Sequence, residues 1–274
     1  MIWSATRSRS FHAAAPTPHA PRPMSLAVAL AAIVACAASA TAQDARQIMG
    51  EVQKRADATS QHYEGLLQVI NAQGKISDKR WTFDRLGSAG ASRSILRFTA
   101  PADVKGVALL IVNHPDRASD QWMWTPALQR DRRIAFQDRS TRFFGTDFSY
   151  EDLEERDVEQ YEYSMEGDET VDGTSCWKIE AKPRKTKSSQ YTSSFVWVRR
   201  DNYVYERIEN FIKSDVVRRL KYSQFEQVQG IWTARLLEMH DLRRNSRTVL
   251  AIDKLQYNVP LKTEMFTLQR FGRE

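Results

Sequence analysis

The sequence predicts a mainly β (α+β) fold: a large, curved antiparallel sheet with helices over its apolar face. Three observations lead to this prediction. A helical period gives way early to an alternation of apolar and polar residues with a period of two. The alternating segments are short, and turn signals such as Asp172-Gly173 separate them at regular intervals. Adjacent charges, as at Arg132-Arg133, place charge on both faces of a strand and argue against a closed outer-membrane barrel, whose lipid face is uncharged.

The first 42 residues are predicted to be a secretory signal that is not part of the fold. Three arginines precede an apolar run that begins near Leu26 and ends in small residues at Ala42, and the segment contains no acidic residue. The run is too short and too rich in alanine for a membrane span. We therefore expect export to the periplasm, cleavage between Ala42 and Gln43, and no transmembrane span in the mature chain.

The segment from Ile33 to Cys36 offers an alternative, because it resembles a lipobox in which Cys36 would be lipidated. Counted from Met24, which is an alternative start, that signal would be too short, and we favour release of a soluble protein. Removal of 42 of the 274 residues takes away three arginines and lowers the net charge from +6 to +3. A mildly basic domain gives little support for a nucleic-acid partner, and we expect none.

The mature chain, residues 43–274, is expected to form one domain. A helix is predicted over residues 43–59, because Ile48, Met49 and Val52 fall on one face and Asp44 can cap its start. Segments with strand character follow at residues 63–70, 79–86, 94–99, 107–112, 121–125, 132–136, 161–165, 177–181, 193–199, 205–211, 216–225, 232–240 and 248–257. They amount to about eleven to thirteen strands, and we take about eleven as the expected number.

Three smaller features complete the predicted secondary structure. Residues 71–74 and 87–90 each contain glycine and are expected to be hairpin tips. Residues 149–156 are expected to form a second short helix. Residues 263–271 are expected to form either a helical turn or a sheet edge.

Residues 120–153 are the stretch most informative about function. Aromatic side chains gather there among charges of both signs: Trp122, Trp124, Phe136, Phe143, Phe144, Phe148 and Tyr150. Large apolar groups in a charged, partly irregular segment suit a surface that meets an apolar ligand or partner. The alternative is that they belong to an ordinary core.

The sequence contains no recognisable catalytic or metal-binding motif. His62, His114 and His240 are far apart and show no metal-ligand spacing. A phosphate-binding glycine loop and a nucleophile elbow are also missing. Acidic runs such as Glu154-Glu155 are typical of a solvated face, although a pair of acids for glycoside hydrolysis would be assembled only in the fold. We expect a non-enzymatic protein without cofactor or metal.

Four segments of the chain carry a family resemblance. They are AQDARQIMGEV at residues 42–52, RFTAPADVKGVALL at 97–110, DQWMWTPALQRDRRIAFQDRSTRFFGTDFSYEDLEERD at 120–157 and DGTSCWKIEAKP at 172–183. The sequence resembles the LolA-like outer-membrane lipoprotein-sorting family of bacterial envelope proteins. The resemblance covers nearly the whole mature chain, and it points to a periplasmic branch linked to resistance–nodulation–division transporters.

The resemblance implies a curved, incomplete antiparallel barrel in which helices cover an apolar concave face. It also implies a carrier that shields a lipid or an acylated lipoprotein during transport toward the outer membrane, with an inner-membrane transporter as a partner. Such a role is physically reasonable, because a sixteen-carbon chain represents on the order of 10 kcal/mol of aversion to water at about 0.8 kcal/mol per CH₂.

A second hypothesis is a non-enzymatic accessory subunit that docks on an envelope transporter or assembly machine, with the aromatic side chains as its interface. An envelope hydrolase is a third and weaker hypothesis. Lipid that copurifies with the protein would distinguish the carrier from the accessory subunit.

The residues expected to line the cavity are large apolar side chains of the strands. We nominate Trp81, Phe83, Phe98, Leu109, Trp122, Trp124, Phe195, Trp197 and Trp232. Pairs at i and i+2, such as Trp81 and Phe83, point to one side of a strand. The alternative is that these residues fill a closed core.

Residues 141–153 are expected to act as a movable lip over the cavity. Phe143, Phe144, Phe148 and Tyr150 would contact the cargo, and Gly145 would be the hinge. The alternative is a fixed loop whose aromatic side chains plug one end of the sheet.

Overall fold

The computed structural model describes residues 44–88 and 90–272. The predicted signal, residues 1–42, together with Cys36 and the cleavage position before Gln43, lies outside these ranges. Within them, no helix has both the length and the apolar character that a membrane crossing requires.

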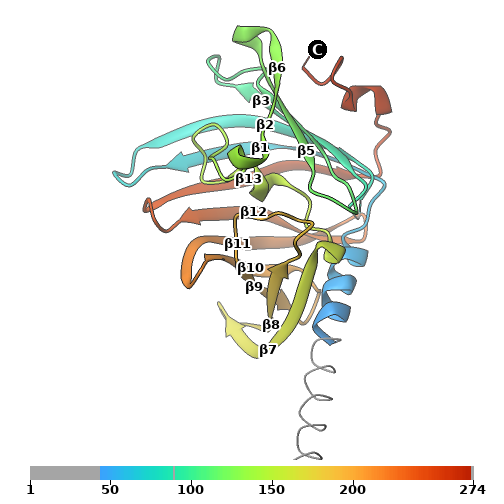
Figure 1. Cartoon of the computed structure of the whole chain (residues 1–274), viewed down its shortest axis with the longest axis vertical. Helices are drawn as coiled ribbons and strands as arrows, with labels where there is room; N and C mark the ends of the chain where they lie inside the picture. The colour runs from blue at the N-terminus through green and yellow to red at the C-terminus, as the bar shows by residue number, and fades with distance from the viewer. Residues whose placement is uncertain (1–43, 89, 273–274) are drawn as a thin grey trace, which may run out of the picture. The chain divides into compact units, whose positions relative to one another are not determined.

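Thirteen strands form a single antiparallel sheet in the order β6-β5-β4-β3-β2-β1-β13-β12-β11-β10-β9-β8-β7. Their bounds are β1 (Ser60–Ile70), β2 (Ile76–Leu86), β3 (Arg93–Ala100), β4 (Ala108–Val112), β5 (Asp120–Thr125), β6 (Arg130–Arg133), β7 (Tyr161–Val171), β8 (Thr174–Pro183), β9 (Ser193–Arg199), β10 (Tyr205–Ile212), β11 (Asp215–Val228), β12 (Ile231–Asp241) and β13 (Ser246–Tyr257). The strands stack from β6 at the top of Figure 1 to β7 at the bottom. Because β6 and β7 are the two edges, the curved sheet is not closed.

The first and last strands of the chain meet in the middle of the sheet. β1 pairs with β2 on one side and with β13 on the other, so that β1–β6 and β7–β13 are two meanders joined by the β1–β13 pairing. Hairpins connect most neighbours, as the turn signals predict. Asp172 and Gly173 have φ of 47° and 84°, and Gln229 and Gly230 have φ of 49° and 85°. Positive φ at both central residues produces the turn whose twist matches that of paired strands.

The expected number of about eleven strands is too low. Each of the predicted segments overlaps a strand. β7 and β11 extend further than predicted, whereas β6 ends at Arg133, before the predicted end at residue 136. None of the segments is left over as a loop, because each one pairs with a neighbour in the sheet.

The expectation of several helices is wrong for the described residues. Residues 44–55 form the one α-helix there. The predicted second helix is reduced to a single 3₁₀ turn, η3 (Glu151–Leu153), and the C-terminal region contains the 3₁₀ turn η5 (Thr263–Phe266). Reciprocal bonds mark the start of η3: the Ser149 amide donates to Asp152 Oδ2 at 2.7 Å, and the Asp152 amide donates to Ser149 Oγ at 3.3 Å, as in a capping box. The turn ends at Glu154, where the backbone is extended with φ of −72° and ψ of 150°.

One face of the sheet carries most of the core. Cross-strand neighbours continue the apolar surface from strand to strand, as Phe83 pairs with Leu96, and Leu96 with Leu109. The helix of residues 44–55 covers β7–β10 through Met49 and Val52. Residues 134–157, which include η2 (Phe136–Asp138) and η3, cover the part formed by β2–β4 and β13. We call residues 134–157 the cover segment and this side of the sheet the covered face.

The opposite face of the sheet has a smaller apolar cluster under the C-terminal segment. Phe266 and Phe271 are 2 % and 1 % exposed and pack on Ile95 and Leu110. Arg97 Nη2 donates to the Phe271 carbonyl oxygen at 2.7 Å, which fixes the end of the segment. The C-terminal region is therefore a structural lid over β3–β5.

Candidate functional site

An apolar cavity of about 320 Å³ lies on the covered face of the sheet. It lies between the strands that the cover segment covers and the strands that the helix of residues 44–55 covers. Its walls come mainly from β1–β3 and β11–β13. They include Tyr63, Trp81, Phe83, Leu96, Leu220, Tyr222, Trp232, Leu237, Leu250, Ile252 and Tyr257. The cover segment adds Phe148, Asp152 and Leu153. The volume falls at the lower end of the range of about 300–1,000 Å³ that is usual for ligand pockets.

Gly65 leaves room for the Trp81 indole in the cavity wall. It is the cross-strand neighbour of Trp81, and a Cβ at this position would meet the Ala251 carbonyl oxygen at 1.9 Å and Trp81 Cζ2 at 3.0 Å. The register of β1 against β13 also shifts between Glu64 and Gly65. A residue without a side chain is therefore required beneath the Trp81 indole.

The aromatic side chains of the cover segment pack on one another and on the sheet. The Phe143 ring stacks on Phe98 with centroids 5.4 Å apart, and it meets Phe144 and Tyr150 edge-on at 5.4 and 5.7 Å. Phe143, Phe148 and Tyr150 are at most 5 % exposed. The cover segment is thus part of the core of this face, and Phe148 forms part of the cavity wall.

Asp147 ties the cover segment to β13. Its side chain is fully buried and accepts hydrogen bonds from Ser246 Oγ at 2.5 Å and Thr248 Oγ1 at 2.8 Å, and its amide donates to Thr248 Oγ1 at 2.8 Å. Arg142 pairs with the same carboxylate at 2.9 Å. These contacts compensate the buried charge and anchor the loop that carries Phe143 and Phe148.

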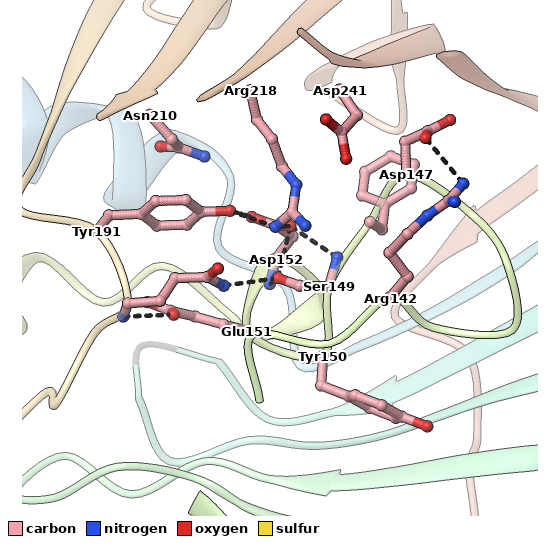
Figure 2. A network of polar contacts seen from close by, with 12 residues as sticks. Arg142, Asp147, Ser149, Tyr150, Glu151, Asp152, Tyr191, Asn210, Arg218 and Asp241 are labelled. Carbon is pink, nitrogen blue, oxygen red and sulfur yellow. Dashed lines mark hydrogen bonds and ion pairs between the residues drawn. The ribbon is translucent and has the colours of Figure 1, made fainter. Parts of the chain in front are cut away.

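A second polar anchor lies beside η3 and is visible in Figure 2, where Arg218 reaches from β11 toward Asp152 and Tyr191. Arg218 Nη1 is 2.8 Å from Asp152 Oδ2, and Tyr191 donates to Asp152 Oδ1 at 2.7 Å. Burial, followed by the charge of Asp152, raises the pKa of Tyr191 well above its ordinary value of 10.0, so its hydroxyl remains a donor. This network positions Asp152 at the boundary between apolar and polar surroundings.

The structure brings together five of the nine residues nominated for the cavity. Trp81, Phe83 and Trp232 line it, and Trp232 is 42 % exposed. Phe98 and Leu109 lie on the same face but are fully buried beneath Phe143, in the closed core.

The other four nominated residues lie on the opposite face of the sheet. Trp122 and Trp124 pack with Phe271 under the C-terminal segment. Phe195 and Trp197 pack with Val171 and Cys176, and Arg207 lies 3.9 Å above the Trp197 ring. Alternation places each i, i+2 pair on one side of its strand but does not determine which side faces the cavity.

The lining residues that the sequence analysis missed come mostly from β11–β13. Tyr222, Leu237 and Leu250 are consecutive cross-strand neighbours on the covered face. Each belongs to an alternating segment, so a signal existed in the sequence. Only the register of the sheet, however, brings them to one place opposite Trp81 and Phe83.

Metal-ligating side chains do not converge in residues 44–88 and 90–272, where no group of three or more His, Cys, Asp or Glu could hold a metal ion. The free thiol of Cys176 is fully buried on the opposite face. Burial raises its pKa to about 11, so the nucleophilic thiolate does not form near neutral pH.

A curved, open antiparallel sheet of this kind is the fold that the chain shares with solved structures of outer-membrane lipoprotein-sorting, DUF1329 and LolA superfamily proteins. A family profile described as "Uncharacterized protein" matches residues 90–273. The chain belongs to this family. No curated protein matches the sequence.

Three solved structures share the fold. An outer membrane lipoprotein-sorting protein domain from Vibrio parahaemolyticus superposes with a TM-score of 0.80 at 27% identity, over 85% of this chain and 100% of that one. A DUF1329 family protein from Desulfovibrio piger gives 0.78 at 28% identity, over 83% and 97%. A LolA superfamily protein from Nitrosomonas europaea shares the fold, with a TM-score of 0.64 at 18% identity over 83% and 97%.

Proposed function

We propose that this protein is a non-enzymatic periplasmic carrier that shields acyl chains of a lipid or an acylated lipoprotein on the way to the outer membrane. The observation that carries the proposal is the apolar cavity of about 320 Å³ between Trp81, Phe83, Leu237 and Leu250. The name of the Vibrio parahaemolyticus relative, a lipoprotein-sorting protein domain, supports the same class of cargo.

The size of the cavity suits a carrier that must also release its cargo. At about 30 Å³ per water molecule, the cavity holds roughly ten waters or a comparable number of methylene groups. Removal of ten methylenes from water is worth about 8 kcal/mol before the costs of binding are subtracted. That energy can offset much of the aversion of an acyl chain to water without making the complex permanent.

Export and a transporter partner belong to the same proposal. We propose that residues 1–42 are a signal cleaved before Gln43, and that the carrier receives or delivers its cargo at an inner-membrane transporter of the resistance–nodulation–division type. N-terminal sequencing of the protein from an envelope fraction tests the first part. A diacylated Cys36 at the mature N-terminus would contradict it.

A fluorescent fatty-acid probe tests the carrier function. Leu237→Trp fills the cavity, whereas Leu242→Trp makes the same change at a side chain that is 41 % exposed. We expect the first variant to weaken probe binding about tenfold or more, because it occupies the space of the chain, and the second to bind like the unchanged protein. Trp124→Ala, on the opposite face, should lower stability but leave the affinity of the folded protein unaltered.

The proposal fails if the unchanged protein binds no acyl probe, or if Leu237→Trp and Leu242→Trp bind it equally well. Mass spectrometry of the protein purified from the envelope provides an independent result, because a carrier should retain lipid.

A second candidate function is that of an accessory subunit of an envelope transporter or assembly machine. The specific observation in its favour is the region around the β5–β6 hairpin. Leu128 in the hairpin and Phe136, which follows β6 in η2, are 60 % and 53 % exposed on either side of the fully exposed strand β6. Exposed apolar side chains next to arginines are typical of docking surfaces. A protein that crosslinks to a transporter through this hairpin, carries no lipid and binds no probe would favour this candidate.

A further inference from the structure

Arg156, at the end of the cover segment, holds a guanidinium group without a counter-ion. Its Nε and Nη2 atoms are buried and have no hydrogen-bond partner. In the described part of the chain, Arg156 forms no ion pair. The Cζ atom of its guanidinium lies 4.3 Å from the centroid of the Tyr161 ring. A buried and unpaired charge is strongly unfavourable, so a guanidinium in this position calls for a function.

The carboxylates near Arg156 have other partners, although one oxygen is left over. Asp157 Oδ1 accepts from the Glu159 amide at 3.1 Å, and Asp157 Oδ2 is buried without a hydrogen-bond partner. Glu151 Oε2 accepts from the Gln190 amide at 2.9 Å. Glu154 pairs with Lys187 and lies 3.2 Å from Arg139 Nη1. Glu155 Oε1 accepts from Arg85 Nη1 at 2.8 Å. Asp152 is occupied by Arg218 and Tyr191, as described above. Glu151, Asp152, Glu154 and Glu155 line the same cavity as Arg156, but among the described residues none of them forms an ion pair with its guanidinium.

Tyrosine side chains surround the guanidinium and supply further free donors. Tyr161, Tyr205 and Tyr222 line a small cavity together with Arg156, and their hydroxyls form no hydrogen bond to any described residue. The Tyr163 hydroxyl is likewise buried without a partner. Burial raises the pKa of Tyr205 and of Tyr222, so both hydroxyls stay protonated and can donate.

This small cavity has a volume of about 110 Å³ and adjoins the apolar cavity. Asp152, Leu220 and Tyr222 line both spaces. At about 30 Å³ per water, the small cavity has room for three or four waters or for one carboxylate or phosphate group. A molecule with an acyl chain in the apolar cavity could therefore place a small head group beside Arg156.

We propose that the cavity around Arg156, Tyr205 and Tyr222 binds the anionic oxygens of a head group, a phosphate or a carboxylate, whose acyl chain lies in the adjoining apolar cavity. This inference rests on the proposed carrier function and names its cargo class, a lipid with a negatively charged head. The guanidinium is a fixed fork of donors that matches two oxygens of such a group, and the tyrosine hydroxyls complete its coordination.

Competition for the fluorescent acyl probe on the full chain tests the inference. Three competitors share a twelve-carbon chain and differ in the head: dodecyl phosphate, dodecanoate and dodecanol. We expect both anions to displace the probe about tenfold better than the alcohol, because hydrogen bonds to charged groups are among the strong ones. Inorganic phosphate alone should compete weakly, because it lacks the chain.

Matched variants assign the preference to particular side chains. Arg156→Gln should abolish the advantage of the anions and leave the affinity for dodecanol unaltered. Arg243→Gln, the same change at an exposed arginine in the β12–β13 turn, should leave both affinities unaltered. Tyr222→Phe removes one hydroxyl with little change in shape, and it should reduce the advantage of the anions about threefold or more.

The outcomes separate the inference from the proposed function. If the unchanged protein binds dodecanol and both anions equally, the inference is overturned and the carrier function stands. If no competitor and no probe binds, the carrier function fails and the inference fails with it. If Arg156→Gln weakens the binding of all three competitors equally, Arg156 only supports the structure. If inorganic phosphate competes as strongly as dodecyl phosphate, the site binds a free anion. Each of these two results overturns the inference.

Ligand-free stability gives a readout that does not depend on binding. Removal of an unpaired buried charge should raise the melting temperature of Arg156→Gln or leave it unchanged. A clear fall would mean that the contact with Tyr161 stabilises the fold, and the head-group preference is then measured with Tyr222→Phe, which keeps the guanidinium. An undiminished advantage of the anions in Tyr222→Phe would overturn the inference.

Discussion

His62 on β1 has an imidazole between two carboxylates. Nδ1 is 2.7 Å from Asp84 Oδ1, and Nε2 is 3.3 Å from Glu64 Oε1. Burial disfavours the charged ring, but the hydrogen bonds to Asp84 and Glu64 outweigh it and raise the pKa of His62 above its ordinary value of 6.5. The stability that this pair contributes is therefore complete below about pH 6.5 and is lost as the pH rises through the folded pKa.

We predict that this loss is visible as a fall in the free energy of unfolding above pH 6.5. Its size should be about 0.2–1 kcal/mol, the range of partly exposed pairs, because the His62 side chain is 28% exposed. Chemical denaturation of the unchanged protein and of His62→Gln at several pH values measures it, and the variant should lack the step. An NMR titration that gives His62 a pKa at or below its ordinary value would contradict the prediction.

Single residues also show where sequence reasoning succeeds and where it stops. Trp81 and Trp124 both lie in alternating segments with an aromatic or apolar partner two positions away, and nothing local distinguishes them. The first lines the cavity and the second is covered by the C-terminal segment, because both faces of β3–β5 are buried. The sequence could not identify Arg156 as an arginine without an ion pair. The nearby acids Glu154 and Asp152 pair instead with Lys187 and Arg218, which are distant in the sequence.

Among the secondary structure elements, the strands were predictable and the cover segment was not. β9 (Ser193–Arg199) has the predicted bounds, because alternation and the flanking turns both mark it. The cover segment owes its conformation to partners far along the chain, such as the bond between Asp147 and Thr248, which are separated by 101 positions. Local patterns carry no signal for contacts of that kind, and so they predict a helix where a single 3₁₀ turn forms.

The cover segment gives a prediction about motion. We predict that residues 141–153 open as a lip when cargo enters, which would expose Phe143 and Phe148 at a cost of about 2–3 kcal/mol each. Without cargo the open state should therefore be rare, on the order of one molecule in a thousand or fewer. Hydrogen exchange with and without lipid measures it. Protection in both states equal to that of the central strands would leave a fixed plug.

Thr248→Val tests the anchor of this segment directly. The variant keeps the shape of the side chain but removes the hydroxyl that donates to the Asp147 carboxylate and accepts from its amide. We expect a loss of about 1–3 kcal/mol in stability, because a buried charged group loses a partner, together with faster exchange in residues 141–150. Thr170→Val, at an exposed position of β7, is the matched control and should change neither quantity.

The C-terminal segment is the element that closes the opposite face. Phe271→Ala should destabilise the protein by about 3–5 kcal/mol, because the ring is 1 % exposed and its removal leaves a cavity beside Ile95 and Leu110. Leu268→Ala, at a side chain that is 41 % exposed, should cost less than about 1 kcal/mol. Denaturant unfolding of both variants measures the difference. Equal losses would mean that the segment does not cover the sheet as a unit.

At the scale of the whole molecule, the open sheet leaves two edges that other chains could extend. The edge strand β6 consists of Arg130, Asp131, Arg132 and Arg133, all exposed, and it is only four residues long. Charged side chains and short length are the usual means by which proteins prevent pairing between sheet edges. Arg133 is held by Asp120 of the neighbouring strand, whereas Arg130 faces solvent without an ion pair among the described residues.

We predict that the arginines of β6 keep the protein monomeric and soluble. The double substitution of Arg130→Thr and Arg132→Thr keeps good strand formers but removes two charges from the edge, so that the backbone groups of β6 become accessible to a second sheet. The variant should oligomerise or aggregate faster than the unchanged protein, as measured by light scattering and size-exclusion chromatography at several concentrations. Arg243→Thr with Arg244→Thr removes the same charge from the β12–β13 turn, away from either edge. If this control aggregates as fast, the loss of net charge is the cause, and β6 has no particular role in protecting the sheet.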